Sequence, residues 1–205
     1  MARLRVGVLV SGRGSNLQAL LDACATPDFP AEIALVVSNK ADAFALERAR
    51  RAKVAIKVIS HRDFSTREAF DAAIDAALRA AGVEFVCLAG FMRILSAWFV
   101  DRWRDRVLNI HPSLLPAYKG LDTHARAIAA GEKFGGCTVH IVRPELDDGP
   151  IILQAEVPIG PTDDAKSLAD RVLMEEHRIY PAALRLIAEK RVKIANETAT
   201  ITLPR

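Results

Sequence analysis

The stretch Leu4-Arg-Val-Gly-Val-Leu-Val-Ser-Gly-Arg-Gly-Ser-Asn16 decides the fold of this chain. Its apolar run, which only Arg5 interrupts with a charge, predicts a buried strand over residues 4–10. The glycine-containing turn that follows leads into a predicted helix over residues 16–24. A strand, a tight turn and a helix in this order form the first half of a βαβ unit, in which the strands are parallel. We therefore expect an α/β protein.

The same alternation continues along the chain. It predicts a mostly parallel, twisted sheet with helices on both faces, which is Rossmann-like in the N-terminal half. After Pro116 the pattern changes and includes a C-terminal hairpin around Asn196-Glu197. The further predicted strands cover residues 33–37, 54–59, 85–89, 107–110, 138–142 and 151–157, the helices cover 43–52, 66–81, 95–103, 123–130 and 165–189, and the hairpin covers 192–203.

The composition is that of a globular protein with 205 residues, of which 51% are hydrophobic. The 28 basic and 25 acidic residues are spread along the chain, so there is no polybasic run of the kind that binds nucleic acid or membranes. No apolar stretch reaches the ~18 residues of a membrane span. Cys24, Cys87 and Cys137 are widely spaced among apolar neighbours, which indicates reduced core thiols in a cytoplasmic protein.

The glycine loop Ser11-Gly-Arg-Gly-Ser-Asn16 predicts an anion site, because free backbone N–H groups and the helix dipole favour a negative charge there. It differs from a dinucleotide fingerprint: Leu17 replaces the third glycine, and the second strand ends in Ser38-Asn39 without an acidic residue. We therefore expect a monophosphate on the N–H groups of Gly14, Ser15 and Asn16. The alternative is a tight turn followed by a helix that Ser15 caps.

Polar side chains also interrupt the apolar sequence near residue 110. Asn109 and His111 are two apart on a predicted strand, so they point the same way. Asp147, from a second loop, could orient the imidazole and keep it protonated, which is the arrangement that stabilises an oxyanion and moves a proton. A single buried Asn or His is more often a hydrogen-bonded core residue. The combination, with Pro112 and Pro116 limiting the loop, predicts group transfer to or from a carbonyl.

With these motifs in view, the chain closely resembles the phosphoribosylglycinamide formyltransferase family over nearly its whole length. The glycine loop, Asn-Ile-His-Pro-Ser-Leu-Leu-Pro at residues 109–116 and Leu-Asp-Asp-Gly-Pro at residues 146–150 carry the resemblance. Further similar stretches are residues 38–42, 88–95, 138–140, 151–154 and 176–181.

The resemblance implies a formyltransferase fold in a single domain, residues 1–205. Within it, a phosphate-binding half, 1–110, and a catalytic and folate-binding half, 111–205, would share one sheet. The implied reaction transfers the formyl group of 10-formyltetrahydrofolate, as co-substrate, to the amine of N1-(5-phospho-D-ribosyl)glycinamide in de novo purine (IMP) biosynthesis. We expect a cytoplasmic monomer or homodimer that acts on small molecules and requires no metal, nucleic acid or membrane.

The resemblance also assigns individual residues. It implies that Asn109, His111 and Asp147 are the catalytic trio. Three residues, Arg13, Arg143 and Pro144, depart from the family's usual pattern. The implied ribotide contacts are Gly12, Arg13, Gly14, Ser15, Asn16, Leu173, Met174, Glu175 and Glu176. The implied folate contacts are Arg67, Met92, Arg93, Ile94, Leu95, Arg143, Pro144, Glu145, Leu146 and Asp147.

Each assignment outside the trio has a simpler alternative. Arg67 could pair with Asp63 or Asp71 on a solvated helix. A second group, Met92, Ile94 and Leu95, could belong to the core, and a third, Glu176 and His177, to a surface helix face. We expect His124 and His140 to be structural or to support the catalytic residues.

Two related enzymes and one non-enzyme remain as alternatives. Formyltetrahydrofolate hydrolases and methionyl-tRNA formyltransferases resemble this core but carry a regulatory or a basic additional domain, for which we expect no room in 205 residues. A nucleotide-binding regulatory module would sense its ligand without turnover. That reading leaves Asn109, His111 and Asp147 without a task.

Overall fold

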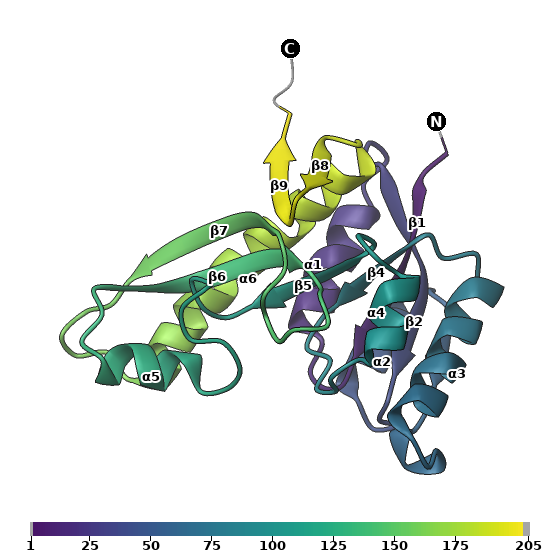
Figure 1. Ribbon diagram of the computed structural model, residues 1–205, viewed down its shortest axis with the longest axis horizontal. Coiled ribbons are helices and arrows are strands. Elements are labelled where there is room, and N and C mark those ends of the chain that lie inside the picture. The colour runs from purple at the N-terminus through teal and green to yellow at the C-terminus, as the bar shows by residue number, and fades with distance from the viewer. Residues whose placement is uncertain (1, 203–205) are drawn as a thin grey trace. The chain divides into compact units, whose positions relative to one another are not determined.

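The computed structural model describes residues 2–202, and its main feature is a seven-stranded sheet in the order β3-β2-β1-β4-β5-β6-β7 (Figure 1). The pairs β1–β2, β1–β4, β2–β3 and β4–β5 are parallel, and β6–β7 is antiparallel. A separate antiparallel pair, β8–β9, forms the C-terminal hairpin. The mostly parallel α/β sheet and the hairpin are confirmed, although Leu203 lies outside the described residues.

The chain divides into two compact units, residues 1–109 and 110–205, with strand β5 crossing the boundary. The expectation of one continuous domain stays a prediction. None of the helices in residues 2–202 combines the length and the apolar composition that crossing a membrane requires.

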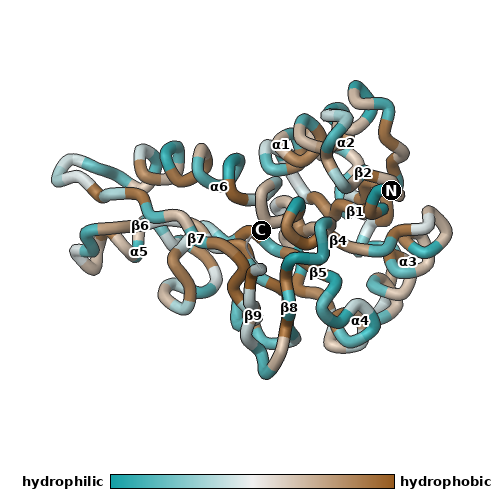
Figure 2. Tube along the Cα trace, turned by 90° about the horizontal axis from the view of Figure 1, so that it is seen from above, coloured by the Kyte–Doolittle hydropathy of each residue, from teal (hydrophilic) through white to brown (hydrophobic). Residues whose placement is uncertain are grey.

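In the first unit, helices cover both faces of the parallel strands. Figure 2 shows α1 and α2 on one side of β1 and β4, and α3 and α4 on the other. Each predicted strand and helix is found within a few residues of its expected ends. The elements are β1 (Leu4–Val10), α1 (Ser15–Cys24), β2 (Ala31–Ser38), α2 (Phe44–Arg51), β3 (Ile56–Val58), a 3-10 turn η1 (His61–Asp63), α3 (Arg67–Ala80), β4 (Phe85–Leu88), α4 (Ala97–Arg102) and β5 (Val107–His111).

Strand β1 forms the centre of this unit, since Val6, Val8, Leu9 and Val10 have no exposed surface. A strand covered by helices on both faces must be apolar along its length, which is the pattern that the sequence shows. Figure 2 shows the same contrast: β1 and β2 are mostly hydrophobic, whereas hydrophilic and hydrophobic residues alternate along the helices around them.

Side-chain caps set several helix starts, but not the first. The hydroxyls of Thr66 and Ser96 accept hydrogen bonds from Ala69 N and Phe99 N, which fixes the starts of α3 and α4. The alternative that Ser15 caps α1 is wrong. Gly14 occupies the cap position with a φ of 71°, makes no side-chain cap, and leaves Ser15 as the first helical residue.

In the second unit, the long helix α6 packs on β6 and β7. The buried residues Leu168, Val172, Ile179, Tyr180 and Leu184 recur at helical spacing and form its core face. The elements are α5 (Thr123–Ala129), β6 (Phe134–Ile141), β7 (Ile151–Pro158), α6 (Ala165–Ala188), β8 (Val192–Ala195) and β9 (Thr198–Ile201).

Strand β6 begins four residues before its predicted start, because Gly135 and Gly136 are part of it. They pair with Val157 and Glu156 on β7. A Cβ on Gly136 would lie 2.1 Å from the carbonyl oxygen of Ala155, so the glycine allows a close backbone approach rather than a turn.

The three cysteines are buried and form no disulfide within residues 2–202. Burial raises the pKa of the Cys24 and Cys137 thiols to about 12. The prediction that the cysteines belong to the core is confirmed.

Gly149 closes the turn between β6 and β7, in which Asp147 lies. A Cβ at this position would lie 1.7 Å from the carbonyl oxygen of Ile141, and backbone atoms cannot move aside as a flexible side chain can. We predict that Gly149→Ala lowers the free energy of unfolding by about 2 kcal/mol or more, measured by urea denaturation. The control is Gly160→Ala, whose Cβ has only an ordinary contact at 3.5 Å with Asp163. Equal stability of the two variants would contradict this account of the turn.

Candidate active site

The imidazole of His111 and the carboxylate of Asp147 lie together in the second unit. The distance from His111 Nδ1 to Asp147 Oδ2 is 3.4 Å, and both side chains are almost completely buried. The other ring nitrogen, Nε2, is 3.0 Å from the backbone carbonyl oxygen of Tyr118. Both neighbours are acceptors, so an imidazolium, which carries a proton on each nitrogen, satisfies both. The sequence predicted this pair, and the structure brings it together.

Asp147 also contacts a second imidazole and a backbone donor. His140 Nε2 is 3.7 Å from Asp147 Oδ1, and Gly120 N donates to Asp147 Oδ2 at 3.0 Å. The backbone of Asp147 itself is in the left-handed region, with a φ of 49°, which Asp tolerates better than most residues. The carboxylate therefore lies between two histidines of this unit.

The sequence predicts only a structural or supporting role for His140, and its proximity to Asp147 is a finding of the structure. Its Nδ1 lies 3.1 Å from the carbonyl oxygen of Ile141, an acceptor, so Nδ1 carries the proton in the neutral ring. Burial lowers the pKa of His140 below its ordinary value of 6.5, against the raising effects of the Ile141 carbonyl and the Asp147 charge. The sequence does contain one signal for this position of His140. The histidine lies two residues after Thr138, another polar side chain that is buried on the same strand.

The segment after His111 is held by a buried hydroxyl. Thr138 Oγ1 donates to the carbonyl of Ser113 at 2.7 Å and accepts from Leu115 N at 3.0 Å. Gln154 Nε2 donates both to Thr138 Oγ1 and to the carbonyl of Leu115. Polar side chains of β6 and β7 thus restrain this segment, in addition to Pro112 and Pro116.

The glycine loop of the first unit turns its carbonyl groups toward the protein. The carbonyl of Gly12 accepts from Ala45 N at 3.0 Å, and that of Arg13 accepts from Arg48 Nε at 2.9 Å. In the described part of the chain, the backbone N–H groups of Gly14 and Ser15 have no hydrogen-bond acceptor. Donors at the N-terminus of α1, without acceptors, are the feature that an anion site requires.

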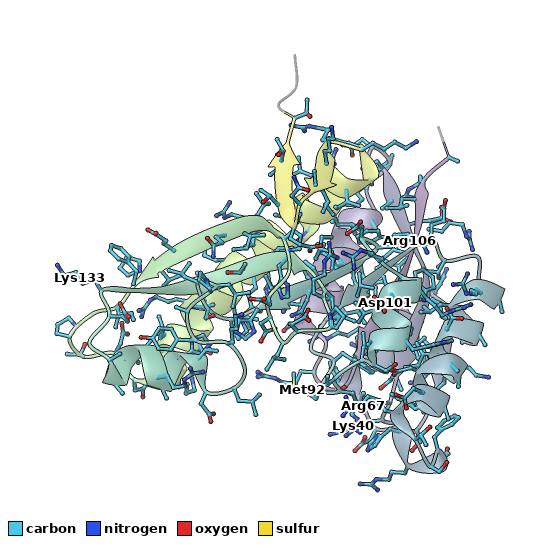
Figure 3. All side chains as sticks on the ribbon, in the orientation of Figure 1. Lys40, Arg67, Met92, Asp101, Arg106 and Lys133 are labelled. Atoms are coloured by element: carbon cyan, nitrogen blue, oxygen red, sulfur yellow. The ribbon has the colours of Figure 1, made fainter. Side chains whose placement is uncertain are left out.

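The predicted folate-contact residues of the first unit are mostly exposed. The side chains of Met92 and Ile94 are 66% and 58% exposed, so the alternative that they belong to the core is wrong, whereas it is right for Leu95. Arg93 and Arg67 are also exposed. Figure 3 shows Arg67, Met92 and Lys40 at the same edge of this unit.

The simpler alternative for Arg67, an ion pair on its own helix, is also tested. Within residues 2–202, no ion pair joins Arg67 to Asp63 or to Asp71. Burial raises the pKa of Asp71, and the charge of Arg67 nevertheless acts to lower it, as a smaller effect. The alternative that Arg67 pairs with a carboxylate of its own helix therefore stays open, and a folate contact for Arg67 stays a prediction.

The predicted substrate contacts of the second unit differ in how deeply their side chains are buried. Arg143 is buried and its guanidinium Nε donates to the carboxylate of Glu197 in the hairpin turn. Residues 144–146, in contrast, are exposed. On α6, Glu176 is only 7% exposed, so the alternative of a surface helix face is wrong for it. Of its neighbours, Leu173 is half-buried, Met174 is exposed, and Glu175 pairs with Arg178.

Asn109 is the remaining predicted catalytic residue. It is half-buried on β5, separated from His111 by Ile110 alone. The geometry of β5 places side chains two apart on one face of the strand. The roles of Asn109, His111 and Asp147 in catalysis stay predictions.

A family model described as formyl transferase matches residues 4–184. The phosphoribosylglycinamide formyltransferase of Escherichia coli is 46% identical over 196 residues, which cover 96% of this chain and 92% of that protein. The chain belongs to the phosphoribosylglycinamide formyltransferase family. The resemblance found in the sequence is thus confirmed.

Other members of the family agree with this assignment. The crystal structure of glycinamide ribonucleotide transformylase 1 from Symbiobacterium toebii has a TM-score of 0.95 and 49% sequence identity, with 97% of this chain and 94% of that chain covered. The trifunctional purine biosynthetic protein adenosine-3 of Homo sapiens is 48% identical over 192 residues, which are 94% of this chain. The chain spans only 14 to 19% of the length of such trifunctional relatives.

The lowered pKa of His140 has a consequence for stability. A histidine that is harder to protonate when folded costs nothing above its unfolded pKa, and destabilises the fold as the pH drops below it. We predict that the free energy of unfolding decreases as the pH is lowered from 7.5 to 5.5, beginning near 6.5. In His140→Asn this pH dependence should be weaker, even if the variant is less stable at every pH. Urea denaturation at several pH values measures it, and parallel curves for the two proteins would show that His140 does not contribute.

Proposed function

We propose that this protein transfers the formyl group of 10-formyltetrahydrofolate to the amine of glycinamide ribotide, as a step of purine biosynthesis. The observation that carries the proposal is the His111–Asp147 pair, 3.4 Å apart in a chain of the phosphoribosylglycinamide formyltransferase family. The acceptor phosphate is assigned to the glycine loop, and the folate to residues 92–95, Arg67 and the 143–147 segment. A cytoplasmic location and a monomeric or homodimeric state stay predictions from the sequence.

In the proposed mechanism, the lone pair of the ribotide amine attacks the formyl carbon. A new C–N bond forms and the carbonyl electron pair moves to oxygen, which becomes an oxyanion. The side-chain amide of Asn109 and the imidazolium of His111 donate hydrogen bonds to this oxyanion. When the tetrahedral intermediate collapses, the bond to the folate nitrogen breaks. The proton lost by the attacking amine reaches that nitrogen through Asp147 or a water molecule beside it.

The surroundings of His111 add one requirement to this mechanism. Its Nε2 already donates to the carbonyl of Tyr118, and its Nδ1 faces Asp147. A hydrogen bond from Nε2 to the oxyanion must therefore replace the bond to Tyr118. Because an oxyanion is a stronger acceptor than a neutral carbonyl, the exchange favours the intermediate over the free enzyme.

The test of the proposed function is an assay with glycinamide ribotide and 10-formyltetrahydrofolate, followed by the folate absorbance. Loss of the formyl group only in the presence of the ribotide supports the transferase. Loss without the ribotide identifies a formyltetrahydrofolate hydrolase instead. Binding of the ligands in a 1:1 ratio without turnover identifies a regulatory module.

Asp147→Asn tests the carboxylate. Asn has nearly the same shape and also tolerates the left-handed backbone, but it cannot stabilise an imidazolium by charge. We predict a loss of about 100-fold or more in kcat, the usual scale for a general acid–base group. The matched control is Asp148→Asn, which neutralises the adjacent carboxylate, exposed and paired with Lys119. Comparable kcat values for the two folded variants would remove Asp147 from the mechanism.

Inorganic phosphate tests the glycine loop. If the N–H groups of Gly14 and Ser15 bind the ribotide phosphate, then inorganic phosphate should compete with the ribotide and should not compete with the folate. Gly14→Val is unsuitable for this test, because a Cβ would lie 2.6 Å from Ala45 Cβ and disturb α2. Steady-state inhibition patterns against each substrate give the answer. Competition with the folate instead would mean that the phosphate is misplaced.

A further inference from the structure

The hydroxyl of Ser11 joins the two loops of the first unit that the proposed function assigns to the two substrates. Ser11 is buried directly after β1, as the first residue of the glycine loop. Its Oγ is 2.8 Å from Met92 N and 2.6 Å from Asn39 Oδ1, and its backbone N donates to the carbonyl of Gly90 at 3.1 Å. The side chain that follows β1 thus contacts the segments that follow β2 and β4.

The direction of these hydrogen bonds follows from the groups involved. The N–H of Met92 can only donate, so Ser11 Oγ accepts from it and gives its single proton to Asn39 Oδ1. This fixes the amide of Asn39, whose Nδ2 then faces His61 Nδ1 at 3.4 Å. A buried hydroxyl that uses both its donor and its acceptor has one preferred orientation, and so does the backbone attached to it.

The loop that carries Met92 is fixed at its other end as well. Ser96 N donates to the carboxylate of Asp71 at 2.6 Å, and Asp71 has no exposed surface. The exposed residues 92–94 therefore lie between two anchors, at Ser11 and at Asp71. A displacement of Ser11 moves the first anchor relative to the second.

The sheet itself does not require the Ser11 hydroxyl. Strands β1 and β4 are already paired from Val6 to Leu9, and Ala89 N donates to the carbonyl of Leu9 at 2.9 Å. The hydroxyl acts beyond the last strand pair, where the chain leaves the sheet for the two loops. Its loss should therefore affect loop placement more than folding.

We propose that Ser11 is a positioning residue that couples the phosphate loop to the 90–95 loop, so that glycinamide ribotide and the folate bind cooperatively. The inference rests on the proposed function. A phosphate on the N–H groups that follow Ser11 fixes the end of β1, and through Ser11 Oγ it fixes the backbone at Met92. The coupling is reciprocal, so each ligand strengthens binding of the other by the same factor.

The test uses glycinamide ribotide with tetrahydrofolate, a pair that cannot react because no formyl group is present. Calorimetry gives the Kd of tetrahydrofolate with and without saturating ribotide. We expect the ribotide to lower this Kd about fivefold or more in the native protein, the usual lower range of such couplings. The coupling ratio is the Kd of tetrahydrofolate without ribotide divided by its Kd with ribotide. In Ser11→Ala this ratio should fall to within about twofold of one, while each ligand alone keeps its affinity within about threefold.

Ser38→Ala is the matched control. Ser38 is also buried, at the end of the neighbouring strand β2, but its hydroxyl donates to the carbonyl of Lys40 and does not reach the 90–95 loop. It should retain the native ratio. If Ser11→Ala does not fold, Ser11→Cys serves in its place, because a thiol keeps the size and hydrogen-bonds only weakly.

The outcomes separate the inference from the proposed function. Three results overturn the coupling role of Ser11 but leave the proposed function standing. They are a coupling ratio near one in the native protein, an unchanged ratio in Ser11→Ala, and an equal loss of the ratio in Ser38→Ala. Failure of the native protein to bind either ligand overturns the proposed function, and the inference with it. A coupling ratio that is lost only in the Ser11 variants supports both the inference and the proposed function.

Discussion

The carboxylate of Asp147 has only 9% of its side chain exposed, and a buried charge is stable only when neighbouring groups compensate it. The second unit supplies the imidazole of His111 and the N–H of Gly120 for this purpose, whereas the neutral ring of His140 lies 3.7 Å from the other carboxylate oxygen without donating to it. The backbone that places the carboxylate is equally constrained, by the left-handed φ of Asp147 and by the close approach of Gly149 to Ile141. The backbone of the turn after β6 therefore places the Asp147 carboxylate beside His111, and the carboxylate orients the His111 imidazole.

The two units contribute different kinds of groups. In the first, the candidate site consists of backbone N–H groups at a helix start and of exposed apolar side chains, which suit a phosphate and a flat ring. In the second, it consists of buried titratable side chains, which suit proton transfer. The proposed binding surface and the proposed catalytic groups are thus separated along the chain, and the short strand β5 carries both Asn109 and His111.

Much of the fold follows from the sequence, because hydrophobic periodicity determines which segments can be covered on two faces. Strand β1 has its predicted bounds, and the pairing of His111 with Asp147 was expected from residue types alone. Other features depend on tertiary contacts that a pattern does not contain. Gly135 and Gly136 lie outside the predicted strand but are part of β6, where they allow two strands to approach. Ser15 resembles a helix cap, although Gly14 takes that position. Similarly, the exposure of Met92 and the position of His140 beside Asp147 are set by neighbours distant in sequence.

The central claim is that His111 and Asp147 act as one unit, and a double-mutant cycle in kcat tests it most directly. The proteins are the native chain, His111→Ala, Asp147→Asn and the double variant, each shown to be folded. If the carboxylate acts through the imidazole, the double variant should be slower than the slower single variant by no more than about threefold, because the second change removes nothing that remains in use. Losses that multiply would mean that the two residues act independently, and would contradict the account.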